Sequence, residues 1–308
     1  MTPLVAVIIP TFNRASALVR CLQSLTIQTF SDFEVLICDD GSTDNTEQVV
    51  ASFNGRLKIK YNRSENFGGP ARPRNRGLLM AKSPYVAFLD SDDWWLPRKL
   101  EFSVQGLDSG ADFVYHPLYV ATRDRQRLLL RVTRTCRIRT PAFNDLLLRG
   151  NTICNSSVVT RRELLDRVGG FSEDRNLIAI EDYDAWLRVA RLTDKFLPLR
   201  RVLGYYWSGG GNISSAHRTL QTTFALQERY KHDLERLNER ALWIPYIRAQ
   251  ACLQLGQTHA AKQELKHASG SPFGPFPLRA RIICLWALVR LRSLTEMIGR
   301  RSRVGRQC

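Results

Sequence analysis

The stretch that decides the fold is residues 5–40, VAVIIPTFNRASALVRCLQSLTIQTFSDFEVLICDD. Residues 4–9 and 33–38 are short, continuous apolar runs, and turn residues end both of them. Runs of this kind are typical of strands that are buried on both faces of a parallel sheet. Residues 15–28 carry apolar side chains at helical spacing and supply the crossover that a parallel pair requires. We therefore expect a strand–helix–strand unit at the start of the chain.

The same alternation continues further along the chain. It predicts a helix, a weaker strand, a second helix and a strand, at residues 45–53, 57–61, 71–81 and 85–89. This order indicates an α/β fold with an open, mostly parallel Rossmann-like sheet, flanked by helices and binding ligands at the carboxyl ends of its strands. Residues 113–119 predict one further strand. The arginine-rich residues 123–140 predict a hairpin that faces either solvent or a partner.

Length and charge set the outer limits of the interpretation. The chain has 308 residues, of which 44% are hydrophobic and 24% charged, enough for one large domain with an appendage. From residue 217 onward the sequence looks helical, so we expect an α/β domain over residues 1–215 and a helical region over 216–308. The formal net charge of +16 favours polyanionic partners such as phosphorylated substrates, anionic lipid surfaces or nucleic acid.

Two features concern the compartment. The seven cysteines are scattered without a C-x-x-C pair, which argues against a zinc site or a disulfide framework. Residues 1–14 lack the basic region and cleavage site of a signal peptide. We expect a cytoplasmic protein.

Acidic side chains gather where predicted strands end. Asp40, Asp90 and Asp92 follow such strands, and a further acidic group covers residues 181–184. Because strand carboxyl ends face one crevice, the repulsion among these carboxylates calls for a cation. A hard divalent ion with oxygen ligands, Mg²⁺ or Mn²⁺, is the natural choice for the Asp-x-Asp pair. The alternative is that these two carboxylates cap the next turn and pair with Arg98 or Lys99.

A basic segment complements the acidic ones. Residues 66–78, NFGGPARPRNRGL, join a glycine turn to three arginines at the start of a predicted helix. Backbone N–H groups at a helix start and guanidinium forks both suit a nucleotide phosphate or a base edge.

Together the segments VAVIIPTFNRASALVRCLQSLTIQTFSDFEVLICDDGSTDNT, NFGGPARPRNRGL, YVAFLDSDDWWLP and GGFSE…EDYDAWLRVA resemble the family 2 glycosyltransferases of the GT-A fold over residues 3–215. The resemblance implies an inverting, metal-dependent hexosyltransferase that takes sugar from a nucleotide-diphosphate sugar, with UDP-sugar favoured. Its acceptor would be a saccharide or a lipid-linked saccharide in the synthesis of a bacterial surface polysaccharide or glycolipid.

The resemblance also implies roles for single residues. Pro10 and Asp40 would line the nucleoside pocket, with Asp40 reading the base, and Arg74 would fill the basic position of the family's A-R-N-x-G segment. Asp90 would lie near the ribose and, with Asp92, hold the metal that bridges the diphosphate.

The family's E-D pair corresponds to Glu181 and Asp182, and the resemblance makes Asp182 the catalytic base. The alternative is a purely structural role, in which Asp182 or Asp184 only caps the helix that follows. Trp207, near a glycine run, could stack on a sugar ring or simply be a buried tryptophan.

The C-terminal region offers a separate interpretation. Residues 246–268 are spaced like one tetratricopeptide helix pair, and residues 278–308 mix apolar side chains with arginines. The second segment suits an interfacial helix with a basic tail, in peripheral contact with an anionic membrane, or else a core helix with a basic end. The rival functions are a nucleotidyltransferase-like enzyme and a basic nucleic-acid-binding protein, although the acidic crevice would repel nucleic acid.

Overall fold

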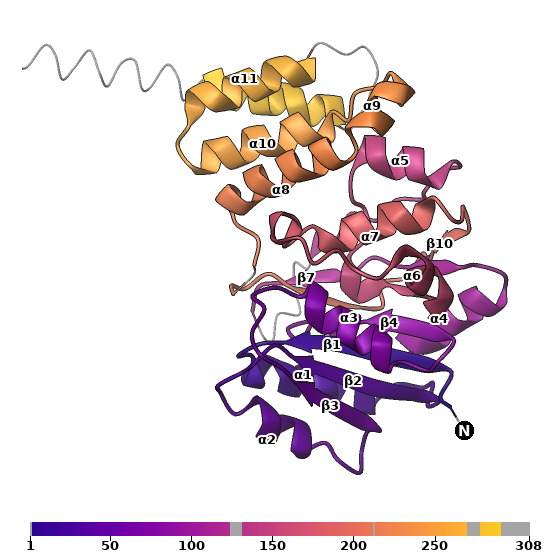
Figure 1. The fold of residues 1–308 in the computed structure, drawn as a ribbon. Coiled ribbons are helices and arrows are strands. Elements are labelled where there is room, and N and C mark those ends of the chain that lie inside the picture. The colour runs from indigo at the N-terminus through magenta and orange to yellow at the C-terminus, as the bar shows by residue number, and fades with distance from the viewer. Residues whose placement is uncertain (1, 124–130, 212, 270–277, 291–308) are drawn as a thin grey trace, which may run out of the picture. The chain divides into compact units, whose positions relative to one another are not determined.

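The computed structural model describes residues 2–123, 131–211, 213–269 and 278–290 (Figure 1). The chain forms two compact units. The first comprises residues 1–146 and 151–213, and the second comprises residues 147–150 and 214–308.

A seven-stranded sheet is the centre of the first unit. Its strand order is β10-β6-β9-β4-β1-β2-β3, with helices along its two faces (Figure 1). The strands β1 to β4 pair in parallel, and β9 lies antiparallel between β4 and β6. The mostly parallel α/β fold is therefore confirmed. The bounds of the strands are Val5–Thr11 (β1), Phe33–Asp39 (β2), Ile59–Arg63 (β3), Tyr85–Phe88 (β4), Phe113–Tyr115 (β6), Val159–Arg161 (β9) and Phe196–Pro198 (β10).

The apolar runs of the sequence explain this sheet. All seven residues of β1 are buried, as are six of the seven residues of β2, which agrees with strands covered on both faces. Helix α3 packs closely on the sheet, because a Cβ atom on its Gly77 would lie only 2.4 Å from Ile8. The helices of this unit are α1 (Ala15–Thr26), α2 (Thr46–Ala51), α3 (Ala71–Met80), α4 (Lys99–Asp108), α6 (Arg162–Val168) and α7 (Glu181–Ala190), and α5 (Ala142–Arg149) continues into the second unit.

A small second sheet corrects one prediction. The single strand expected at residues 113–119 is wrong, because the chain divides there into β6 and β7 (Tyr119–Ala121), which belong to different sheets. Pro117 lies in the gap, where the missing N–H interrupts strand pairing. The second sheet has the order β5-β11-β7-β8, with bounds Trp94–Trp95 (β5), Gly204–Trp207 (β11) and Arg131–Val132 (β8). It brings β11 beside the turn that follows β4.

The second unit is helical, as predicted. Its helices are α8 (Ala216–Arg229), α9 (Lys231–Leu237), α10 (Trp243–Gln254) and α11 (Thr258–Ser269), and residues 278–290 are helical too. Buried Arg248 of α10 ties this unit together by donating to the carbonyl oxygen of Thr223 in α8 at 2.8 Å. Residues 124–130 of the expected hairpin, residues 270–277 and the tail 291–308 lie outside the described residues.

Candidate active site

The predicted site residues of the first unit lie around one edge of the central sheet. Pro10 is buried near the end of β1, Asp40 follows β2, and Asp90 and Asp92 come shortly after β4. Since these strands run in parallel, their carboxyl ends meet at that edge.

Asp40 organises the loop that follows β3. Its carboxylate accepts hydrogen bonds from the backbone N–H groups of Phe67 and Gly68, both at 3.0 Å. The loop comes so close that a Cβ atom on Gly41 would lie 2.9 Å from the backbone nitrogen of Asn66, and Gly41 has a φ of +87°. Only glycine fits there without strain. The carboxylate of Asp40 and the loop after β3 are therefore held in a fixed position relative to each other.

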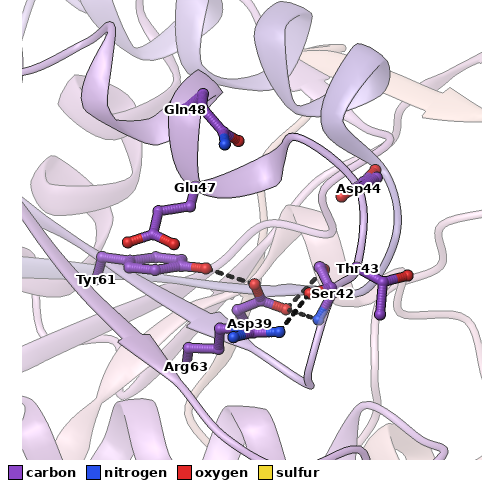
Figure 2. A pocket seen from close by; sticks show the side chains of 8 residues that line it. All are labelled: Asp39, Ser42, Thr43, Asp44, Glu47, Gln48, Tyr61 and Arg63. Atoms are coloured by element: carbon purple, nitrogen blue, oxygen red, sulfur yellow. Dashed lines mark hydrogen bonds between the residues drawn. The ribbon is translucent and has the colours of Figure 1, made fainter.

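A second network fixes the turn between β2 and α2 (Figure 2). Asp39 accepts hydrogen bonds from the backbone N–H of Ser42 at 2.8 Å and from the hydroxyl of Tyr61 at 2.5 Å. Arg63 donates to the carbonyl oxygen of Ser42 at 2.8 Å. Burial, together with the hydrogen bond to Asp39, raises the pKa of Tyr61. Tyr61 and Arg63 were missed by sequence reasoning, because they come from β3 and have no local motif. The network borders a small polar pocket of about 150 Å³.

Arg74 joins three parts of the site. Its Nη2 atom lies 2.7 Å from Oδ1 of Asp90, and its Nη1 atom lies 2.5 Å from Oε1 of Glu181. Asn155 donates to the same oxygen of Asp90 at 3.0 Å. Burial opposes the charge of Arg74, but Asp90 and Glu181 outweigh it and raise the pKa of the guanidinium. The arginine is therefore a permanent cation between two acidic segments that are far apart in the sequence.

The alternative pairing of the Asp-x-Asp carboxylates with Arg98 or Lys99 is wrong. Arg98 pairs with Glu101 at 2.7 Å, and Lys99 is fully buried over the ring of Trp95 at 3.6 Å. Asp92 instead pairs with Arg14.

The acidic turn is electrostatically crowded. Burial raises the pKa of Asp92, and so does the charge of Asp90, while Arg14 lowers it. Burial also raises the pKa of Asp93, which receives a hydrogen bond from the backbone N–H of Trp207 at 2.7 Å. Among the residues that the structure describes, no group of three or more His, Cys, Asp or Glu side chains is arranged to hold a metal. A pair of carboxylates still suits Mg²⁺ or Mn²⁺, which keep waters and substrate phosphates as their other ligands. The crowding of negative charge fits such a cation.

Asp182 occupies the first turn of α7. Burial raises its pKa to about 7, and the charge of Glu181 adds to this effect while Arg74 opposes it. Neither aspartate occupies the N-cap position, which belongs to Ile180. Asp182 accepts a hydrogen bond from the backbone N–H of Tyr183 at 2.6 Å, and Asp184 pairs with Arg188 at 2.9 Å. A carboxylate with a pKa near neutrality is suited to accept a proton from a hydroxyl group.

Trp207 is engaged within the protein. Its indole N–H donates to the carbonyl oxygen of Gly210 at 3.1 Å, and a Cβ atom on Gly209 would lie 2.2 Å from the ring. The guanidinium of Arg20 lies 4.9 Å from the ring centroid. These contacts hold a half-buried tryptophan under a glycine turn, and its stacking on a sugar ring stays a prediction.

Residues 6–169 match the model of Glycosyl transferase family 2, which covers more than half of the chain. The chain therefore belongs to glycosyltransferase family 2, as the sequence segments predict.

Several relatives are similar over different lengths. The validoxylamine A glucosyltransferase of Streptomyces hygroscopicus is 50% identical over 92 residues, which are 29% of this chain and 22% of that protein. An uncharacterized glycosyltransferase of Rickettsia conorii is 38% identical over 37% of this chain and 19% of its own length. The chain thus spans about a fifth of these two relatives. The Escherichia coli enzyme named UDP-Glc:alpha-D-GlcNAc-diphosphoundecaprenol beta-1,3-glucosyltransferase WfaP is 29% identical, over 69% of this chain and 80% of its own.

Solved structures agree on the fold. TarS of Staphylococcus aureus, residues 1–349, matches with a TM-score of 0.57 at 21% identity, covering 96% of this chain and 92% of that one. The mannosyltransferase PcManGT of Pyrobaculum calidifontis, in complex with GDP-Man and Mn²⁺, matches with a TM-score of 0.55 at 22% identity, covering 96% of this chain and 84% of that one.

Proposed function

We propose that this chain is an inverting, metal-dependent glycosyltransferase that moves a hexose from a UDP-sugar to a saccharide or lipid-linked acceptor in bacterial surface polysaccharide synthesis. The observation that carries this proposal is the bridge by Arg74 between Asp90, of the Asp-x-Asp turn, and Glu181, beside the candidate base. Donor-binding and proton-accepting groups are thereby held at one edge of the sheet.

The nucleoside would lie against Pro10 and the loop that Asp40 organises, with Asp40 reading the base. A uridine donor is supported by two relatives: WfaP is named for UDP-Glc, and TarS has been solved with UDP-GlcNAc. The arrangement around Asp40 supports base recognition because two backbone N–H groups of the loop already donate to the Asp40 carboxylate, so that ordering the loop on binding costs little.

Asp92 and Asp90 would hold Mg²⁺ or Mn²⁺, and the ion would neutralise the charge of the leaving diphosphate. The solved complex of PcManGT with GDP-Man and Mn²⁺ supports this choice of ion. Arg74 adds fixed positive charge on the other side of Asp90 and keeps that carboxylate oriented.

Asp182 would accept the proton of the acceptor hydroxyl. As that oxygen forms its bond to the anomeric carbon, the bond from this carbon to the diphosphate oxygen breaks, and the electron pair leaves with the nucleoside diphosphate. Attack opposite to the leaving group inverts the configuration. The pKa of Asp182 near 7 supports the role, because such a group is partly ionised at neutral pH and basic enough to take the proton.

The acceptor and the membrane contact are linked proposals. WfaP is named for a GlcNAc-diphosphoundecaprenol substrate, which supports a lipid-linked saccharide as the acceptor of this chain. Residues 214–308 carry sixteen Lys and Arg against six Asp and Glu, and on helix 278–290 the apolar side chains of Ile283 and Leu288 are 68% and 44% exposed. Exposed apolar residues among basic ones favour peripheral binding to an anionic membrane, at its inner face. Among the described helices, none is long and apolar enough to cross a bilayer.

The test is calorimetric binding of UDP, with GDP and dTDP as comparators, with and without Mn²⁺. We expect UDP binding that requires Mn²⁺ and is lost in Asp92→Ala but kept in the matched control Glu239→Ala, an exposed acid of the helical unit. No binding of any nucleotide would refute the donor site. Product analysis separates the nucleotidyltransferase alternative, which would release pyrophosphate in place of a nucleoside diphosphate.

A further inference from the structure

Arg14 makes two contacts that the proposed reaction does not explain. Its Nη1 atom pairs with Oδ2 of Asp92, and its Nη2 atom donates to the backbone carbonyl oxygen of Gly211. One guanidinium thus joins the start of α1 to the acidic turn after β4 and to the glycine segment after β11. The side chains of Arg14 and Asp92 are 24% and 15% exposed, so solvent and ions reach the pair.

The backbone around Arg14 is firmly held. The N–H of Asn13 donates to the hydroxyl of Ser42 at 2.8 Å, and the side-chain oxygen of Asn13 accepts from the backbone N–H of Thr43 at 2.7 Å. On the other side, the N–H of Ala15 donates to Asp44 at 3.0 Å. Both neighbours of Arg14 are therefore anchored to the turn between β2 and α2. A change in the contacts of Arg14 requires movement of its side chain only.

The glycine segment, defined as residues 209–211, packs closely at Gly209, where a Cβ atom would lie 2.2 Å from the ring of Trp207 and 2.7 Å from the carbonyl oxygen of Thr122. Gly210 and Gly211 have φ values of +117° and +77°, and a Cβ atom on Gly210 would meet nothing within 4 Å. Two contacts that fasten the segment are the bond from Trp207 to Gly210 and the bond from Arg14 to Gly211. The second contact comes from the same guanidinium that pairs with Asp92.

We propose that Arg14 is the internal counter-cation of Asp92 in the free enzyme, and that the divalent ion of the donor complex displaces it and so releases the glycine segment. This inference rests on the proposed metal-dependent donor site. A carboxylate oxygen that pairs with Arg14 is not free to ligate a metal, and two cations at the same carboxylate repel each other. Metal binding and the position of residues 209–211 therefore become coupled through one side chain.

The experiment titrates Mn²⁺ alone into the full chain and follows the free ion by electron paramagnetic resonance. Arg14→Met removes the competing charge, and we expect it to bind Mn²⁺ on the order of tenfold more tightly than the wild type. Arg14→Lys keeps the charge but lacks the fork that bridges two acceptors, so its Mn²⁺ affinity should stay near the wild-type value.

Hydrogen exchange of peptides that contain residues 208–211 provides the second readout. In the wild type, the N–H of Ser208, which donates to the carbonyl oxygen of Ala121 at 2.8 Å, should exchange more slowly in the free enzyme than once Mn²⁺ and UDP are bound. In Arg14→Met and Arg14→Lys it should already exchange fast without ligand. Unchanged thermal unfolding of both variants serves as the folding control.

The outcomes separate this inference from the donor site. If the wild type binds Mn²⁺ and UDP but Arg14→Met shows neither tighter Mn²⁺ binding nor faster exchange, the counter-cation role of Arg14 is wrong and the donor site stands. If the wild type binds no Mn²⁺, with or without UDP, both proposals are wrong.

Discussion

Arg74 and Glu181, one on α3 and the other opening α7, form a buried ion pair with an N–O distance of 2.5 Å. Both side chains are 4% exposed, and the second nitrogen of the guanidinium reaches Asp90 at 2.7 Å. A buried cation between two carboxylates is sensitive to the loss of any one member, because the remaining charges stay in a medium that solvates them poorly.

Replacing Arg74 tests this arrangement. Arg74→Ala leaves two carboxylates without their cation, and we expect it to lower the free energy of unfolding by about 3 kcal/mol. Sugar transfer should fall steeply as well, because Asp90 and the start of α7 lose their common anchor. Arg72→Ala is the control, since its pair with Glu173 is 41% and 37% exposed and should contribute at most about 1 kcal/mol. Urea unfolding and initial rates measure both effects, and equal losses in the two variants would contradict the argument.

Asp182→Asn should separate activity from stability. Without the base, we expect kcat to fall by about 10² to 10⁴. At pH 8, by contrast, the variant should be more stable than the wild type. A carboxyl whose pKa is raised on folding binds its proton more tightly in the folded state, so the free energy of unfolding falls as the pH rises from the unfolded pKa to about 7. The neutral amide removes that loss, and its Tm at pH 8 should exceed that of the wild type. An inactive variant with a lower Tm would speak against the raised pKa.

The pH dependence of the wild type follows from the same group. With Asp182 as base, kcat/KM should rise with pH through about 7 and then level off, because the ionised form is the active one. The measurement is a profile of kcat/KM against pH at saturating Mn²⁺. It runs from about pH 5 to about pH 9, so that it extends to both sides of the Asp182 pKa. Asp184→Asn, which changes a neighbouring acid paired with Arg188, is the comparison and should keep the same midpoint. A profile that is flat through neutrality would exclude Asp182 as the titrating base.

The sheet could be predicted because its information is local. Apolar runs such as residues 33–38 form strands that are buried on both faces of a sheet. The helical spacing of the residues between two such runs predicts a crossover helix, which joins the strands in parallel. The acidic residues at the strand ends follow from this, since the ends of parallel strands meet at one edge. The roles of Asp40, Asp92 and Asp182 remain predictions.

Other features had no local signal. The division of residues 113–119 between two sheets depends on β11, which arrives about ninety residues later and pairs with β7. The partners of Asp92 were predicted among neighbours in sequence, Arg98 and Lys99, whereas the structure supplies Arg14 from a distant loop. An arginine can reach several acceptors, so only the folded chain decides which one it meets.

Gly41 and Gly55 provide a matched pair of positions for testing whether the loop that Asp40 holds takes part in donor binding. Both have positive φ values, +87° and +82°, so Ala substitution strains the backbone at each by a similar amount. Only at Gly41 would the new Cβ atom meet backbone, 2.9 Å from the nitrogen of Asn66, while Gly55 faces open space. We therefore expect Gly41→Ala to displace the loop that Asp40 holds and to weaken UDP binding at least tenfold, about 1.4 kcal/mol. Gly55→Ala should bind UDP like the wild type and lose only about 1 kcal/mol of stability. Calorimetry with UDP and Mn²⁺ on both variants decides the matter: equal affinities would show that the loop held by Asp40 takes no part in binding the nucleotide.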